Sequence, residues 1–201
     1  MAAGRTVLAG VLAGVGMYIW TSIAHLLLPI SGAGIQEISN DETALLTQLR
    51  GTLGDASGLY FFPSVGLKPG ASAAERNAAM KNYDAKLAVN PSGLLIYHPP
   101  GQQSLTPGQL ISEFLVELLE SLLAILLLAQ SRFTTFGARV GFVTVAGILA
   151  SLPTNVSYWI WYGFPVTYTA ANMLIQIVGF VVAGVVAALI LRSRTERVVE
   201  A

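Results

Sequence analysis

"ISEFLVELLESLLAILLLAQ", residues 111–130, is an apolar segment long enough to cross a bilayer as a helix, which takes about 20 residues. It nevertheless contains three carboxylates, Glu113, Glu117 and Glu120, and no basic residue. Because they are four and three residues apart, all three lie on one face of a helix. Charged side chains at membrane depth usually face the interior of a bundle or a partner. The segment therefore predicts a membrane helix with a buried polar stripe.

Three further segments are long and almost free of charge, residues 6–28, 142–161 and 168–191. The chain has 201 residues, of which 54% are hydrophobic and 11% charged, whereas about 25% are charged in a typical soluble domain. We predict an integral membrane, mainly α protein with a four-transmembrane-helix bundle. The apolar run of the first segment exceeds the 7–15 residues usual in a signal peptide, so we expect it to be an uncleaved anchor.

The predicted organisation has four parts. They are a transmembrane helix 1 over residues 1–29, a small extracytoplasmic α+β domain over 30–106, transmembrane helices 2–4 over 107–192, and a cytoplasmic tail over 193–201. Basic residues near span ends mark the cytoplasmic side of a membrane protein. The arginines beside the predicted spans are Arg5, Arg132, Arg139, Arg192, Arg194 and Arg197. All fall on one side of a four-span chain, which predicts an inner (cytoplasmic) membrane location with both termini cytoplasmic and residues 30–106 outside.

The predicted outer domain contains two similar halves. "SNDETALLTQLRG" (39–51) precedes "GLYFFP" (58–63), and "SAAERNAAMKNYDAKLAVNPSG" (72–93) leads into "GLLIYHPP" (93–100). Each half opens with a Ser-x-x-Glu capping pattern, Ser39 with Glu42 and Ser72 with Glu75. We predict helix–strand–helix–strand, with Gly51 ending the first helix and strands at 60–62 and 94–97. The aromatic segments are interpreted as domain core, the alternative being a docking surface for another subunit.

The carboxylate helix has a clear beginning. Thr106, Pro107 and Gln109 suit the cap, first and third positions of a helix. A rise of about 1.5 Å per residue then places Glu113 near the outer interface and the other two glutamates deeper. Polar residues at matching depth are His25, Asn155 and Gln176. These residues predict one buried polar cluster in the outer half of the bundle.

Three hypotheses account for the stripe. Protonated glutamates hydrogen-bond across the bundle or pair with a basic residue of another subunit; a divalent metal binds; or a proton or cation passes. For a metal, carboxylates with one imidazole suit Fe, Mn or Zn. "ELLE" (117–120) also resembles the glutamate-x-x-glutamate element of iron permeases, without the basic residue that precedes it in that family. A bis-histidine haem is not expected, because His25 is the one histidine at membrane depth.

Two other patterns concern packing and the membrane surface. Gly10 and Gly14 form a GxxxG pair, which lets two helix backbones approach closely but does not identify the neighbour. Trp159, Trp161 and Tyr162 cluster at a span end, as aromatic side chains do at the membrane–water interface. The alternative for this cluster is a pocket for a quinone or a lipid.

The composition limits the function. The formal net charge is zero, so no nucleic-acid partner is expected, and without cysteine neither disulfides nor thiolate chemistry can occur. No phosphate-binding, dinucleotide-binding or serine-hydrolase motif is present. We expect a non-catalytic membrane protein, an accessory or structural subunit of a larger assembly or a homo-oligomer in the lipid bilayer. The alternative is a cation- or proton-handling transporter, and the second alternative is a metal-dependent membrane enzyme.

Overall fold

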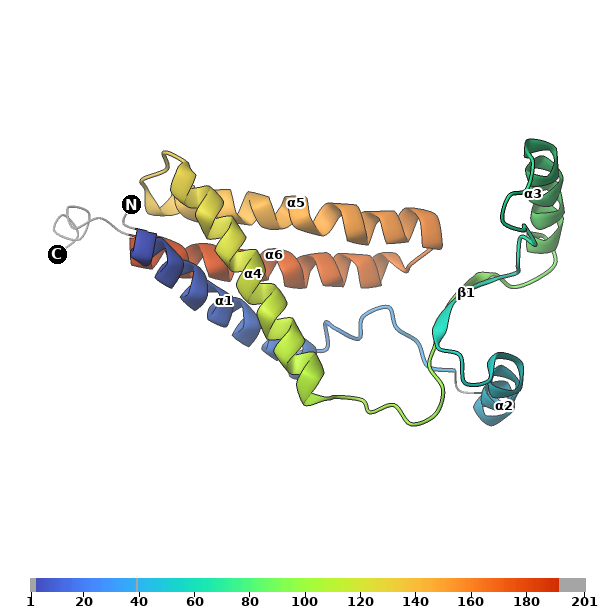
Figure 1. The fold of residues 1–201 in the computed structure, drawn as a ribbon. Coiled ribbons are helices and arrows are strands. Elements are labelled where there is room, and N and C mark those ends of the chain that lie inside the picture. The colour runs from blue at the N-terminus through green and yellow to red at the C-terminus, as the bar shows by residue number, and fades with distance from the viewer. Residues whose placement is uncertain (1–2, 39, 192–201) are drawn as a thin grey trace. The chain divides into compact units, whose positions relative to one another are not determined.

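The computed structural model describes residues 3–38 and 40–191, which form six helices and two strands (Figure 1). The elements, in chain order, are α1 (Ala3–Leu26), α2 (Glu42–Leu53), β1 (Gly58–Phe62), α3 (Ala73–Leu87), β2 (Gly93–Tyr97), α4 (Pro107–Gln130), α5 (Phe136–Tyr162) and α6 (Val166–Leu191). The chain forms two compact units: a helical unit of the residues up to Gln36 and from Leu105 onward, and an α+β unit, Glu37–Ser104. The tail arginines at 192, 194 and 197 lie outside the described residues.

Three helices of the described chain are long and apolar enough to cross a membrane, α1, α5 and α6, with 24, 27 and 26 residues. The prediction of a membrane-embedded, mostly helical protein is supported to this extent. The fourth predicted span corresponds to α4, which also has 24 residues but carries the three glutamates. Its length therefore matches a span, while its composition separates it from the other three.

In the helical unit, α6 packs against both α5 and α1, and α1 packs in turn against α4. Helix α4 runs obliquely to α5 and α6 (Figure 1). Small residues fill much of the common core, so that the helices approach closely. The buried core residues are Ala9, Ala13, Met17, Ala124, Ile125, Leu128, Val143, Phe180, Ala183, Ala187 and Leu191.

The GxxxG pair of α1 faces α4, so its neighbour lies in the same chain. A Cβ added to Gly14 would lie 2.6 Å from the Ser121 Oγ and 2.9 Å from the Leu118 Cα. The Ser121 hydroxyl donates a hydrogen bond of 2.9 Å to the Gly10 carbonyl. Glycine is therefore required here by the close approach of the two helices.

The described arginines of the helical unit, Arg5, Arg132 and Arg139, lie at one end of that unit. The Arg5 Nε donates to the Ile190 carbonyl at 2.8 Å, which joins the start of α1 to the end of α6. Arg132 lies in the connection between α4 and α5, and the Arg139 Nε donates to the Phe133 carbonyl of that connection at 3.3 Å. The start of α1, the end of α6 and the α4–α5 connection share this end (Figure 1).

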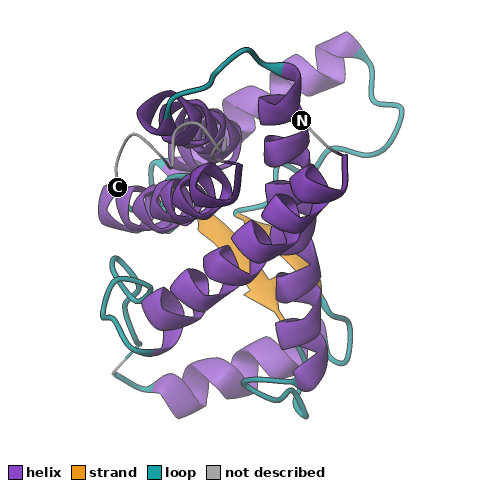
Figure 2. Ribbon diagram, turned by 90° about the vertical axis from the view of Figure 1, so that its left-hand side faces the viewer, coloured by secondary structure: helices purple, strands orange, loops and turns teal. Residues whose placement is uncertain are grey.

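In the α+β unit, β1 and β2 pair antiparallel, and Gly58 lies opposite Tyr97 and Phe62 opposite Gly93 (Figure 2). Both strands are present as predicted, and each begins earlier than expected because its leading glycine also joins the ladder. The side chains of Tyr60 and Tyr97 pack edge to face on one side of the sheet. On the opposite side, Leu59 and Ile96 are 64% and 66% exposed. A two-stranded sheet alone cannot bury the side chains on both of its faces, so the aromatic segments remain partly exposed.

The second predicted capping box is confirmed, whereas the first depends on a residue that the structure does not describe. At α3, the Ser72 side chain accepts from the Glu75 amide and the Glu75 side chain accepts from the Ser72 amide. At α2, Asp41 stands at the N-cap with φ 48° and no side-chain cap bond, while residue 39 lies outside the described residues. The helix also continues past Gly51, since an interior glycine costs only about 1 kcal/mol, and stops at Gly54, whose positive φ suits a helix end.

Candidate functional site

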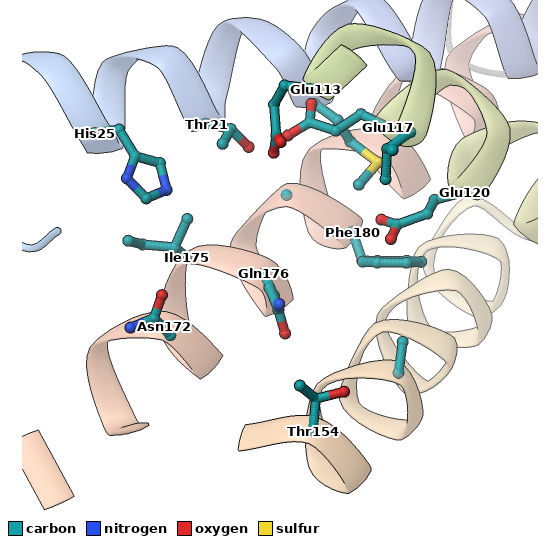
Figure 3. Close-up of a pocket in the computed structure, with 14 residues that line it drawn as sticks. Thr21, His25, Glu113, Glu117, Glu120, Thr154, Asn172, Ile175, Gln176 and Phe180 are labelled. Carbon is teal, nitrogen blue, oxygen red and sulfur yellow. The ribbon is translucent and has the colours of Figure 1, made fainter. Parts of the chain in front are cut away.

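A cavity of about 370 Å³ lies among α1, α4, α5 and α6, and eight polar side chains line it (Figure 3). They are Thr21 and His25 of α1, Glu113, Glu117 and Glu120 of α4, Thr154 of α5, and Asn172 and Gln176 of α6. The remaining wall is apolar, with Met17, Val116, Ala150, Ile175, Gly179 and Phe180. The structure thus brings the glutamate stripe, His25 and Gln176 to one cavity.

Helical periodicity explains why these side chains converge. Thr21 and His25 are four residues apart, as are Asn172 and Gln176, so each pair lies on a single helix face. The phase of α4 is set at its start, where the Thr106 side chain accepts from the Gln109 amide and the Gln109 side chain accepts from the Thr106 amide. This is the helix start expected from the sequence.

Glu117 is the most enclosed of the three glutamates, with 5% of its surface exposed. The Thr21 hydroxyl hydrogen-bonds its carboxylate, but Oε2 is buried and has no hydrogen-bond partner. Buried polar atoms are nearly always hydrogen-bonded, because leaving one unpaired costs about 1–3 kcal/mol and more for a charged group. The Glu117 Oε2 therefore marks a position where a donor or a cation would be stabilised.

Glu113 and Glu120 are exposed to the cavity and its surroundings. The Glu113 and Glu117 side chains extend toward the same space beside Thr21, while Glu120 lies farther along, near Phe180 (Figure 3). The lining holds three carboxylates and one imidazole but no lysine or arginine. Like charges repel more strongly in a low-dielectric site, so the lining favours a positive occupant.

The geometry gives no support to the hypothesis of a bound Fe, Mn or Zn ion. Throughout residues 3–38 and 40–191, no three side chains of the His, Cys, Asp and Glu types are placed so that they could hold a metal ion. The predicted ligands, His25 and the three glutamates, share a cavity without converging on one point.

Asn155 takes a different place from the one predicted. It is absent from the cavity lining, and its side-chain nitrogen donates to the Gln176 Oε1 at 3.0 Å and to the Ser151 carbonyl at 2.8 Å. It therefore orients Gln176, whose side chain reaches the cavity. His25 lines the cavity and also a neighbouring one of about 330 Å³, together with Thr21 and Glu113.

Sequence reasoning missed three polar residues of the lining. Thr21 and Asn172 each precede a predicted member by four residues, so helical spacing from His25 and Gln176 would have found them. Thr154 has no comparable signal, since its helix contributes only Ala150 besides it. A polar residue at membrane depth therefore indicates that the residues four positions before and after it on the same helix belong to the candidate site as well.

The aromatic cluster lies apart from this cavity. Trp159, Trp161 and Tyr162 stand in the last turn of α5, are all exposed, and Trp161 is 78% exposed. None of them lines the cavity. Their interfacial role stays a prediction.

Comparison with known proteins gives no match to a protein-family model, a curated protein or a solved structure.

Proposed function

We propose that this chain is a membrane protein that binds a proton or a cation in the carboxylate cavity and moves it part or all of the way across the bilayer. The observation that carries the proposal is the Glu117 carboxylate, which is buried inside an apolar bundle with one oxygen unpartnered. Intramembrane carboxylates are common in proton and ion pathways. A carboxylate that served only packing would be expected to have both oxygens satisfied by the protein.

The proposal includes α4 as a fourth span. Its 24 residues correspond to about 36 Å, enough for a hydrocarbon layer of about 30 Å. Its outward face is apolar: Leu115, Leu119, Leu123 and Leu126 are all exposed. Such a surface is unfavourable in water and suited to lipid. The glutamates, in contrast, point into the cavity.

The same proposal orients the chain. The described arginines of the helical unit share one end of it, and the cavity lies toward the other end, where α1 finishes and α6 begins. Basic residues favour the cytoplasmic side. We therefore place the arginine end and both termini in the cytoplasm, with the α+β unit and the cavity toward the outside.

The test is proton flux into proteoliposomes that contain a pH-sensitive dye. After an external acid pulse, vesicles with the full chain should acidify faster than protein-free vesicles, with either Na⁺ or K⁺ present. Glu117→Gln should return the rate to the protein-free level, because the amide cannot release a proton or balance a cation. Glu37→Gln, which changes a carboxylate of the α+β unit, should keep the faster rate.

Two results would overturn the proton pathway: a wild-type rate equal to that of empty vesicles, or a Glu117→Gln rate equal to wild type. The first would favour the other candidate, an accessory subunit of a larger assembly. That candidate has its own support in the α+β unit, where Leu59, Phe61 and Ile96 are exposed on one face of the sheet. Exposed apolar clusters of this kind are typical of subunit contacts.

A further inference from the structure

The lining of the carboxylate cavity fits a molecule larger than a proton or a bare ion. Its volume of about 370 Å³ falls within the range of about 300–1,000 Å³ that is usual for small-molecule sites. A dehydrated metal ion would need several protein ligands converging at about 2.0–2.6 Å. No such group of three acidic, histidine or cysteine side chains exists among residues 3–38 and 40–191.

The carboxylates of the cavity could accept hydrogen bonds from an ammonium group. A protonated primary amine offers three N–H donors and no acceptor. The Glu117 Oε2 is an unpartnered acceptor, and the Glu113 carboxylate extends toward the same space (Figure 3). Asn172, whose side-chain nitrogen donates to the Tyr168 carbonyl at 2.9 Å, also lines the cavity, farther from the two glutamates (Figure 3). Charge-assisted bonds of ammonium to carboxylate are among the stronger hydrogen bonds in proteins.

Apolar side chains form the rest of the cavity lining. Met17, Ile175 and Phe180 line it and are each at most 5% exposed, so this wall is fixed by the packing of the bundle. A bare ion gains nothing from such a wall, whereas a hydrocarbon chain gains about 25 cal/mol for each Å² that it removes from water. The carboxylates and this apolar wall together would suit a ligand with a positive nitrogen and a short apolar body.

We propose that the ligand of this cavity is a small organic cation with a protonated amine, held by Glu117 and Glu113 and packed against Met17, Ile175 and Phe180. This inference rests on the proposed function, since it specifies the cation that the cavity binds. The amine is either a free small molecule or the headgroup of an amine-bearing lipid, because both present the same ammonium.

The experiment uses the purified full chain in an uncharged detergent and measures the midpoint of thermal unfolding. The probes are n-butylammonium, its uncharged counterpart n-butanol, Na⁺, Mn²⁺ and a short-chain phosphatidylethanolamine. Butylammonium should raise the midpoint saturably, while butanol and the inorganic ions at equal concentration should not. If the amine-bearing lipid alone raises it, the source is a lipid headgroup.

Two variants connect the effect to the cavity. Glu117→Gln should weaken butylammonium binding at least about tenfold, as loss of a charged hydrogen-bond partner does. Ala150→Leu narrows the cavity without removing a carboxylate, so it should abolish butylammonium binding. Glu37→Gln serves as the matched control outside the helical unit. Ala150→Leu also keeps the test decisive if Glu117→Gln does not fold.

The outcomes separate this inference from the proposed function. Stabilisation by Mn²⁺ or Na⁺ alone, or Glu117-dependent proton flux without any amine binding, would overturn the inference and leave the proposed function standing. Neither binding nor flux would overturn both. Butylammonium binding that persists unchanged in Ala150→Leu and Glu117→Gln would place the amine elsewhere and contradict the inference.

Discussion

At the scale of the residue, two capping boxes among the described residues differ in charge. The α3 box pairs Ser72 with Glu75, and the α4 box pairs Thr106 with the uncharged Gln109. The Ser72 side-chain hydroxyl and then the Ser72 backbone amide, by hydrogen bonding the Glu75 carboxylate, hold the pKa of Glu75 below its usual 4.5. The start of α3 should therefore respond to pH, while the start of α4 should not respond through its cap.

The direction of this response follows from the lowered pKa. When α3 opens, Glu75 returns to its usual pKa, so the stabilisation is fully present above 4.5 and is lost as the pH falls through the lower folded value. Hydrogen exchange on the full chain, corrected for intrinsic rates, should show lower protection of the first turn of α3 well below pH 4.5 than well above it.

Glutamine also serves in a capping box, which supplies the control. Glu75→Gln should keep the helix start and give protection that is independent of pH. If the α3 protection of Glu75→Gln falls with pH as much as that of the wild type, another group causes the effect and the prediction fails.

The candidate site shows how far single residues could be predicted. The spacing of Glu113, Glu117 and Glu120 was sufficient to place them on one face, because helix geometry alone decides it. That Glu117 is the enclosed one depends on how α4 packs against α1, where the Thr21 hydroxyl hydrogen-bonds its carboxylate, and the spacing within α4 does not predict that contact. Depth along a helix can be predicted from sequence, whereas the direction of the neighbouring helix cannot.

At the scale of the element, the contact between α1 and α4 depends on the absence of a side chain at Gly14. Gly14→Ala would gain about 1 kcal/mol of helix preference, but its methyl group would meet the backbone of Leu118, which no rotamer change can relieve. Overpacking costs about 1–3 kcal/mol. We expect a net loss of stability and a thermal midpoint in detergent that falls by roughly 2–4 °C for each kcal/mol lost.

Gly4 provides the matched control, because it lies in the same helix and an added Cβ would have nothing within 4 Å. Gly4→Ala should leave the midpoint unchanged or raise it. A midpoint for Gly14→Ala at or above that of Gly4→Ala would show that α1 and α4 do not pack as closely as described.

Element boundaries show where local signals failed. The capping residues of α3 and α4 were predicted correctly, because each motif satisfies its own backbone amides without help from the rest of the chain. The same pattern did not define α2, which starts after Asp41 and extends to Leu53. The sequence pattern predicts that α2 ends at Gly51, but a second glycine, Gly54, has the backbone angle that ends a helix.

At the scale of the whole molecule, the topology depends on whether α4 crosses the membrane together with the three apolar helices. Four crossings put the α4–α5 connection on the side opposite the α+β unit. Three crossings, by α1, α5 and α6 alone, put that connection on the same side as the unit. Hydropathy is indecisive here because the glutamates offset the leucines of α4. The structure adds that the exposed Leu115, Leu119, Leu123 and Leu126 lie on a different face from the glutamates, which line the cavity.

Single cysteines can distinguish the two arrangements without background, since the chain has none of its own. We choose three exposed positions: Ser57→Cys in the α+β unit, Thr134→Cys between α4 and α5, and Val166→Cys at the start of α6. Intact cells are treated with a maleimide that does not cross membranes. With four spans, positions 57 and 166 should be labelled, and position 134 only after the cells are permeabilised.

The opposite pattern is equally specific. If α4 does not cross, positions 57 and 134 share one side and position 166 lies on the other, so labelling of 57 and 134 together in intact cells would contradict the fourth span. It would also remove the carboxylates from the bilayer, because a helix lying outside it would hold Glu117 near water rather than in a low-dielectric bundle. The proposed cation pathway therefore depends on this topology. Labelling of Thr134→Cys tests the fourth span and, with it, this requirement of the pathway.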